Sequence, residues 1–154
     1  MNQKLLSGLC IVLVAGAITA CNPKSDEPTA VMTNAIITHE MAGAAITIKP
    51  GDSFQVKLES VPTAGYMWLV KSKPDFLEEQ EGVDMLATDP ENQLQPGFTG
   101  GNHYVVRTYK ATGIGKGQLE LIEAREWEVF DEAGNLTNPA AIEDTFKLTI
   151  EAVE

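Results

Sequence analysis

Apolar and polar residues alternate along much of the chain after residue 44. In residues 53–59 every second side chain is apolar, and residues 145–151 repeat the pattern; the apolar positions are Phe54, Val56 and Leu58, and then Phe146, Leu148 and Ile150. Ile46 with Ile48 and Leu119 with Leu121 show the same spacing in shorter form. Successive side chains of a strand point to opposite faces, so these segments predict half-buried antiparallel strands.

Other segments complete an all-β pattern. Residues 66–70 and 103–109 are rich in aromatic and β-branched residues, which predicts two central strands. Turn signals rich in glycine, proline and asparagine occur at 50–52, 96–97, 113–115 and 132–135. Helical periodicity is absent beyond a short turn at 139–142. The fold class predicted is an all-β, Ig-like β-sandwich of about seven to nine antiparallel strands.

The N-terminus has a different character. Lys4 precedes an apolar run over 5–17, which is shorter than the ~20 residues that span a bilayer. The run predicts a secretory signal. Its end, Ile-Thr-Ala-Cys at 18–21, resembles a bacterial lipoprotein signal, which implies a lipid on Cys21; an ordinary signal peptide with Cys21 as a bystander is the alternative. The domains predicted are a lipoprotein signal peptide at 1–20, the acylated cysteine and a flexible polar linker at 21–32, and one folded domain at 33–154.

Cysteine content and charge limit the possibilities further. Cys10 lies in the predicted signal, so Cys21 is the one cysteine left and no disulfide within the domain is possible. Removal of residues 1–20 takes away Lys4 and no acidic residue, so the net charge of −11 becomes −12. This charge disfavours nucleic acid and anionic membrane surfaces as partners. Membrane attachment would therefore depend on lipid.

Three loop-like segments stand at strand ends, in a fixed order. The first has a proline with fixed φ and a glycine that can adopt positive φ, around two small residues: Pro62, Thr63, Ala64, Gly65 and Tyr66. It predicts a narrow, stiff tip, although the same pattern suits a plain hairpin turn. The second is Thr99, Gly100 and Gly101, which suits close backbone approach or a flexible strand entry; the loop-like residues 93–98 before it predict a long, mobile connection. The third is Arg125, Glu126 and Trp127, with two residue types common at interface hot spots.

These segments resemble the three binding loops of the chagasin-like inhibitors of cysteine peptidases. The family pattern has an Asn-Pro-Thr-Thr-Gly-aromatic loop, a Gly-x-Gly-Gly loop and an Arg-Pro-Trp loop, and the likeness extends from about residue 44 to the C-terminus. The resemblance implies a reversible, noncovalent block of a papain-like cleft. It implies that Thr63 lies near the catalytic thiolate and that Trp127 packs on the leaving-group side. The alternative is that Trp127 caps the core of the domain. Trp68, by contrast, is predicted to be buried in that core.

Three positions depart from the family pattern. Val61 stands where the family has asparagine, Phe98 where it has the first glycine, and Glu126 where it has proline. The first change removes a side chain that could brace its own turn. The last frees φ and adds a negative charge beside Trp127.

Two other functions compete with inhibition. The chain has two histidines, His39 and His103, and neither belongs to a catalytic triad or a zinc spacing, so we expect no enzyme, no cofactor and no metal. A non-inhibitory Ig-like surface lipoprotein that acts as a protein-interaction module stays open. The predicted partners are a papain-like cysteine peptidase and, through lipid on Cys21, a membrane; the predicted state is a monomer. The predicted location is the bacterial cell envelope, at the outer membrane of a Gram-negative host because Asn22 follows Cys21.

Overall fold

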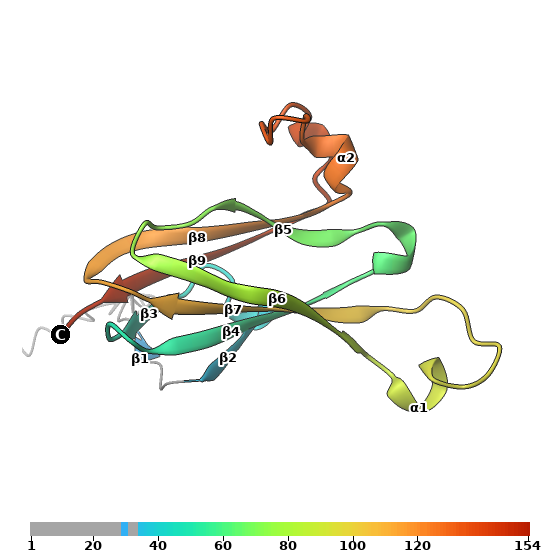
Figure 1. The fold of residues 1–154 in the computed structure, drawn as a ribbon, viewed down its shortest axis with the longest axis horizontal. Helices are drawn as coiled ribbons and strands as arrows, with labels where there is room; N and C mark the ends of the chain where they lie inside the picture. The colour runs from blue at the N-terminus through green and yellow to red at the C-terminus, as the bar shows by residue number, and fades with distance from the viewer. Residues whose placement is uncertain (1–28, 31–33) are drawn as a thin grey trace, which may run out of the picture.

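Two β-sheets pack face to face in the computed structural model, which describes residues 29–30 and 34–154 (Figure 1). One sheet has five strands in the order β1 (Thr29–Ala30), β3 (Ala45–Ile48), β9 (Asp144–Ala152), β8 (Gly115–Ala124) and β5 (Met67–Ser72). The other has four strands in the order β2 (Ala35–Thr38), β4 (Ser53–Ser60), β7 (His103–Ala111) and β6 (Leu77–Ala87). The predicted all-β sandwich is confirmed.

Not every strand pairing is antiparallel. The long strands pair antiparallel, as predicted, but β1 with β3, β3 with β9 and β2 with β4 are parallel. The chain between β2 and β4 passes through the 3₁₀ turn η1 (His39–Met41) and then β3 of the opposite sheet. Such a crossover brings a strand back in the same direction, which a tight hairpin cannot do.

The alternating positions form the core between the sheets. Phe54, Val56 and Leu58 of β4 are buried, and so are Phe146, Leu148 and Ile150 of β9. Each such side chain contributes about 1.5–3 kcal/mol by leaving water.

The two strands predicted to be central differ in outcome. β7 lies between β4 and β6, as expected, but β5 is an edge strand, so the prediction for residues 66–70 is wrong. The apolar character of β5 has another cause. Trp68 is buried in the main core, while Leu69 packs on the outer face of the sheet against a second cluster built on Ile122, Ala124 and Val129. A strand with apolar contacts on both faces looks central in sequence.

Besides η1, four short helical segments connect strands in the described part of the chain. They are η2 (Pro62–Ala64), α1 (Pro90–Gln93), α2 (Glu126–Val129) and η3 (Pro139–Ala141). The last confirms the helical turn predicted at 139–142. α2 and η3 carry the residues that bury the outer face of β5 and β8, including Val129 and Ala141.

The N-terminal predictions lie largely outside this description. The signal segment, Cys21 and the linker up to residue 28 are not among the described residues. Thr29 and Ala30, at the end of the predicted linker, pair with Ile46 and Thr47 of β3. In the part of the chain that the structure describes, no helix has the length and apolar character to cross a bilayer.

Candidate functional site

Loop one, residues 61–66, is a tight turn between the two sheets. It joins β4 of the four-stranded sheet to β5 of the five-stranded sheet through η2. The Ala64 N–H donates to the Val61 carbonyl at 2.9 Å, and the Gly65 N–H donates to the Pro62 carbonyl at 2.9 Å. Gly65 has φ +88°, a conformation that costs other residues free energy. Thr63 and Ala64 are exposed at the tip, as the narrow-tip prediction requires.

Loop three, residues 125–127, carries the exposed tryptophan. It follows β8, and Trp127 lies in the first turn of α2 with 69% of its surface exposed. The alternative that Trp127 caps the core is therefore wrong, whereas Trp68 is 2% exposed and belongs to the core as predicted. A Cβ placed on Gly65 would lie within 3.0 Å of the six-membered ring of Trp127. The indole thus rests directly on the backbone of loop one.

Arg125 joins loop three to loop one. Its Nε donates to the Ala64 carbonyl at 2.9 Å, and its guanidinium carbon lies 4.5 Å from the centre of the Tyr66 ring. Glu128 accepts from Arg125 Nη1 at 3.1 Å, and this hydrogen bond is the main reason that the pKa of Arg125 is raised. A planar guanidinium can make all three contacts at once. The first and third predicted loops therefore form one connected surface.

Loop two, residues 98–101, lies at the end of a structured connection between β6 and β7. Gly100 and Gly101 have φ of +93° and +96°. A Cβ on Gly100 would lie 3.9 Å from Thr63 Oγ1, which places loop two beside the tip of loop one. Gln93 packs against Gly101 and donates from Nε2 to the Asn102 carbonyl at 2.8 Å. Gly100 is thus a member of loop two that approaches loop one.

Sequence reasoning did not predict the ordered structure of the connection between β6 and β7. Asp89 accepts from the Asn92 N–H at 3.3 Å at the start of α1, and Pro90 occupies the first position of the helix. An aspartate followed by proline is a recognised helix start, so this signal could have been found. The stretch expected to be mobile upstream of Gly100 instead contains a helical turn tied to the loop by Gln93.

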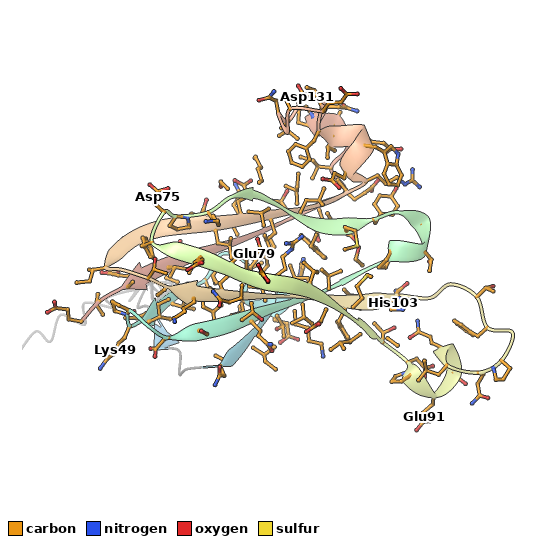
Figure 2. All side chains as sticks on the ribbon, in the orientation of Figure 1. Lys49, Asp75, Glu79, Glu91, His103 and Asp131 are labelled. Carbon is orange, nitrogen blue, oxygen red and sulfur yellow. The ribbon has the colours of Figure 1, made fainter. Side chains whose placement is uncertain are left out.

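All three loops gather at one end of the sandwich. η2 and the connection containing α1 lie at the right of Figure 1, and α2 stands above them. Figure 2 shows His103, the first residue of β7, on the same side, and Lys49 at the opposite end. We call the surface formed by residues 61–66, 98–101 and 125–127 the loop end. A groove of about 870 Å³ adjoins it, lined by Val70, Lys71, Glu126, Trp127, Phe130, Asp131, Glu132 and Gly134.

A polar hollow lies beneath the loops, and sequence reasoning did not anticipate it. It has a volume of about 360 Å³ and is lined by His39, Glu59, Ser60, Val61, Trp68, Asn102, Glu123 and Asp144. Burial raises the pKa of Glu123 most, and the negative charges of Asp144, Glu143 and Glu59 raise it further, while the hydrogen bond from Ser60 lowers it. Ser60 continues the alternation of Phe54, Val56 and Leu58, so a polar residue on a core face was the available signal.

Each histidine has a polar partner within the described chain. His39 Nε2 lies 2.9 Å from Asp144 Oδ2, and His103 Nδ1 lies 3.1 Å from the Gly101 carbonyl. Within 29–30 and 34–154, His, Cys, Asp and Glu side chains form no group of three or more that could hold a metal ion. The loops present backbone, small side chains and the exposed indole of Trp127, with Arg125 joining loops one and three, which suits binding.

Known proteins resemble the chain in sequence and fold. It is 29% identical over 92 residues to amoebiasin-1 of Entamoeba histolytica, covering 59% of this chain and 82% of that protein. It is 26% identical over 142 residues to an attachment protein of Pseudomonas phage Pf3, covering 90% of this chain but 29% of the phage protein. The crystal structure of the cysteine protease inhibitor EhICP2 from Entamoeba histolytica superposes with a TM-score of 0.58, 18% identity and coverage of 82% and 99%.

The family assignment rests on a longer match. The pattern of the chagasin family of peptidase inhibitors, I42, matches residues 47–150, which is more than half of the chain. That range includes all three loops and the strands from β3 to β9 in whole or in part. The protein belongs to the chagasin family of peptidase inhibitors.

Proposed function

We propose that this protein is a reversible, noncovalent inhibitor of papain-family cysteine peptidases that fills the active-site cleft with its loop end. The observation that carries the proposal is the contact of Trp127 with Gly65, together with the Arg125 hydrogen bond to Ala64. These contacts fix two loops that are distant in sequence as one surface. Preformed loops lose little conformational entropy on binding, which favours tight association.

The conformation of loop one explains how the tip would resist cleavage. Its backbone forms a 3₁₀ turn, and the Val61 and Pro62 carbonyls accept hydrogen bonds within that turn. A peptidase attacks the carbonyl of a peptide that is held in a near-attack geometry. A closed turn does not present a carbonyl in that way, so the tip would occupy the catalytic centre without being cut.

The departures from the family pattern are compatible with this role. Val61 replaces a side chain that could brace the turn, but its carbonyl accepts from both Ala64 N–H and Tyr66 N–H, at 2.9 and 3.3 Å. Backbone hydrogen bonds to the Val61 carbonyl thus stabilise the turn. Phe98 and Glu126 are exposed and leave the Trp127–Gly65 contact in place.

The test is inhibition of papain and a cathepsin-L-like enzyme by residues 21–154 with Cys21→Ser, with trypsin as the control. We expect inhibition of the papain-like enzymes alone. Thr63→Arg places a long charged side chain at the exposed tip, so we expect at least a hundredfold rise in Ki with unchanged thermal stability. Equal Ki values for the Thr63→Arg variant and the protein without this substitution would contradict binding through loop one.

A lipid anchor and a cell-envelope location belong to the same proposal. The support is the sequence around Cys21 alone. Two or more acyl chains hold a protein stably on a membrane, whereas one holds it weakly. Labelled palmitate should enter the full-length protein expressed in a Gram-negative host, and Cys21→Ser should abolish both the label and recovery with the outer membrane. Labelling that survives Cys21→Ser would contradict the assignment.

The monomeric state is also proposed, and it has its own test. One copy carries all three loops, so nothing at the loop end calls for a second chain. Light scattering should give the mass of one chain at micromolar concentration. A stable dimer that dissociates on Trp127→Ala would contradict this and would place the loop end in a self-interface.

A second candidate function is a non-inhibitory interaction module on the cell surface. The specific observation in its favour is the similarity to a phage attachment protein over 90% of this chain. Such a module would use a sheet face or the groove beside Trp127 and would leave peptidases active. Thr63→Arg distinguishes the two candidate functions, because it should weaken peptidase inhibition but should not affect binding through a sheet face.

A further inference from the structure

Two side chains at the base of the loops join the sheets. Ser60 is the last residue of β4, directly before loop one, and Glu123 lies two residues before loop three on β8. Ser60 Oγ donates to Glu123 Oε1 at 2.6 Å, and Ser60 is 2% exposed. This hydrogen bond connects the stem of loop one, in one sheet, to the stem of loop three, in the other.

A second pair connects loop one to loop two. Asn102 directly follows Gly101, and its Nδ2 donates to Glu59 Oε1 at 2.6 Å. The Glu59 carbonyl accepts from Trp68 Nε1 at 2.8 Å, which holds the two stems of loop one together. Every loop of the proposed inhibitory surface is therefore tied to the Glu59–Ser60 pair at the end of β4.

These contacts lie on the polar hollow beneath the loops. The other titratable groups that line it are His39 and Asp144, which bond to each other. Glu143, whose backbone N–H donates to the Glu123 carbonyl at 2.9 Å, adds a nearby negative charge. The partial burial of Glu123 carries a desolvation cost for its carboxylate, which is the main reason that its pKa is raised. The alternation in β4 would also accept an apolar residue at Ser60. A polar pair at these positions therefore points to a requirement other than core packing.

We infer that Ser60 with Glu123, and Glu59 with Asn102, are positioning residues that set the spacing of the three loops for peptidase binding. The inference rests on the proposed inhibitory function. None of the four is one of the predicted loop residues, so their effect on a target would act through Thr63, Gly100 and Trp127. Charge-assisted hydrogen bonds are short and directional, which suits them to fixing the separation of loop stems.

The experiment compares Ki and amide hydrogen exchange in a small set of variants. Glu123→Ala removes the acceptor, Ser60→Ala removes the donor, and Glu123→Gln keeps an oxygen that can accept from Ser60. Glu120→Ala is the matched control, because Glu120 is on the same strand and bonds Lys71 at 2.9 Å away from the hollow. We expect Ki to rise at least tenfold in Glu123→Ala and Ser60→Ala, and less than threefold in Glu123→Gln and Glu120→Ala.

Amide exchange separates positioning from general destabilisation and from failure of the proposed function. The Ala64 and Gly65 N–H groups, which are hydrogen-bonded inside loop one, should exchange at least tenfold faster in Glu123→Ala, while amides of β9 remain as protected as in the wild type. If the wild type inhibits no papain-like enzyme, the proposed function fails and this exchange result still decides whether the pair positions the loops. Unchanged Ki and unchanged exchange in Ser60→Ala, the least disruptive variant, would overturn the inference.

Discussion

Gly65→Ala tests the junction of loops one and three most sharply. The new Cβ would lie within 3.0 Å of the Trp127 ring, and the residue would keep φ near +88°. The left-handed conformation costs an alanine about 1–2 kcal/mol. Gly51→Ala is the matched control, because Gly51 has φ +96°, a new Cβ there would have no neighbour within 4 Å, and it precedes β4 at the end opposite the loops.

The difference between the two variants measures the indole contact. Trp127 is 69% exposed, so about a third of its side-chain area of ~250 Å² is covered by the protein. Exposing this covered area to water costs up to about 2 kcal/mol at ~25 cal/mol per Å². We therefore expect Gly51→Ala to lose about 1–2 kcal/mol of unfolding free energy and Gly65→Ala to lose about 2–4 kcal/mol.

The assay is urea unfolding followed by circular dichroism, with Ki against papain measured on the same samples. The proposed function makes Trp127 an interface hot spot, and displacement of such a residue costs a complex about 2 kcal/mol or more. This corresponds to a rise in Ki of about thirtyfold for Gly65→Ala. Gly51→Ala should inhibit as the wild type does. Equal destabilisation by both variants, together with an unchanged Ki for Gly65→Ala, would refute the account of this junction.

Three further predictions concern the same end of the molecule. Glu126→Pro should keep the thermal stability and inhibit at least as tightly, because position 126 opens α2 and Arg125 already has the extended φ of −84° and ψ of 119° that precede proline; a tenfold weaker Ki would contradict this. Glu123 has a raised pKa in the folded state, so its contribution to stability is present at acid pH and is lost as pH rises through that pKa. The unfolding free energy of the wild type relative to Glu123→Gln should therefore fall as the pH rises from acid to neutral, and a pH-independent difference would contradict a raised pKa of Glu123. Trp68→Phe should cost about 1–3 kcal/mol by leaving the Glu59 carbonyl without its donor, as measured by chemical unfolding; no loss would mean that water replaces the indole N–H.

The core and the two-sheet architecture could be predicted because period-two alternation reports burial directly. The alternate apolar positions are buried where the pattern placed them, namely Phe54, Val56 and Leu58 of β4 and Phe146, Leu148 and Ile150 of β9. The position of β5 could not be predicted in this way. Leu69 is apolar because α2 and η3 cover the outer face of its sheet, and alternation along one strand does not reveal what a distant helix covers.

The loop residues could be found from sequence, but their mutual contacts could not. Gly65 has the positive φ that its residue type allows, and Pro62 stands at the start of the 3₁₀ turn η2. The Arg125 hydrogen bond to Ala64 spans 61 residues, and no local pattern reports such a pair. Likewise Ser60 and Glu123 stand 63 residues apart, and the one sign of their role was a serine on an apolar face.

The most direct measurement of the central claim is protection of the catalytic thiol. Iodoacetamide alkylates the active-site cysteine of papain, and the rate is followed with and without saturating amounts of this protein. Occupation of the cleft by the loop end predicts a rate at least tenfold slower, restored by Thr63→Arg. Binding that leaves the alkylation rate unchanged would contradict the account and would assign the contact to a surface away from the active site.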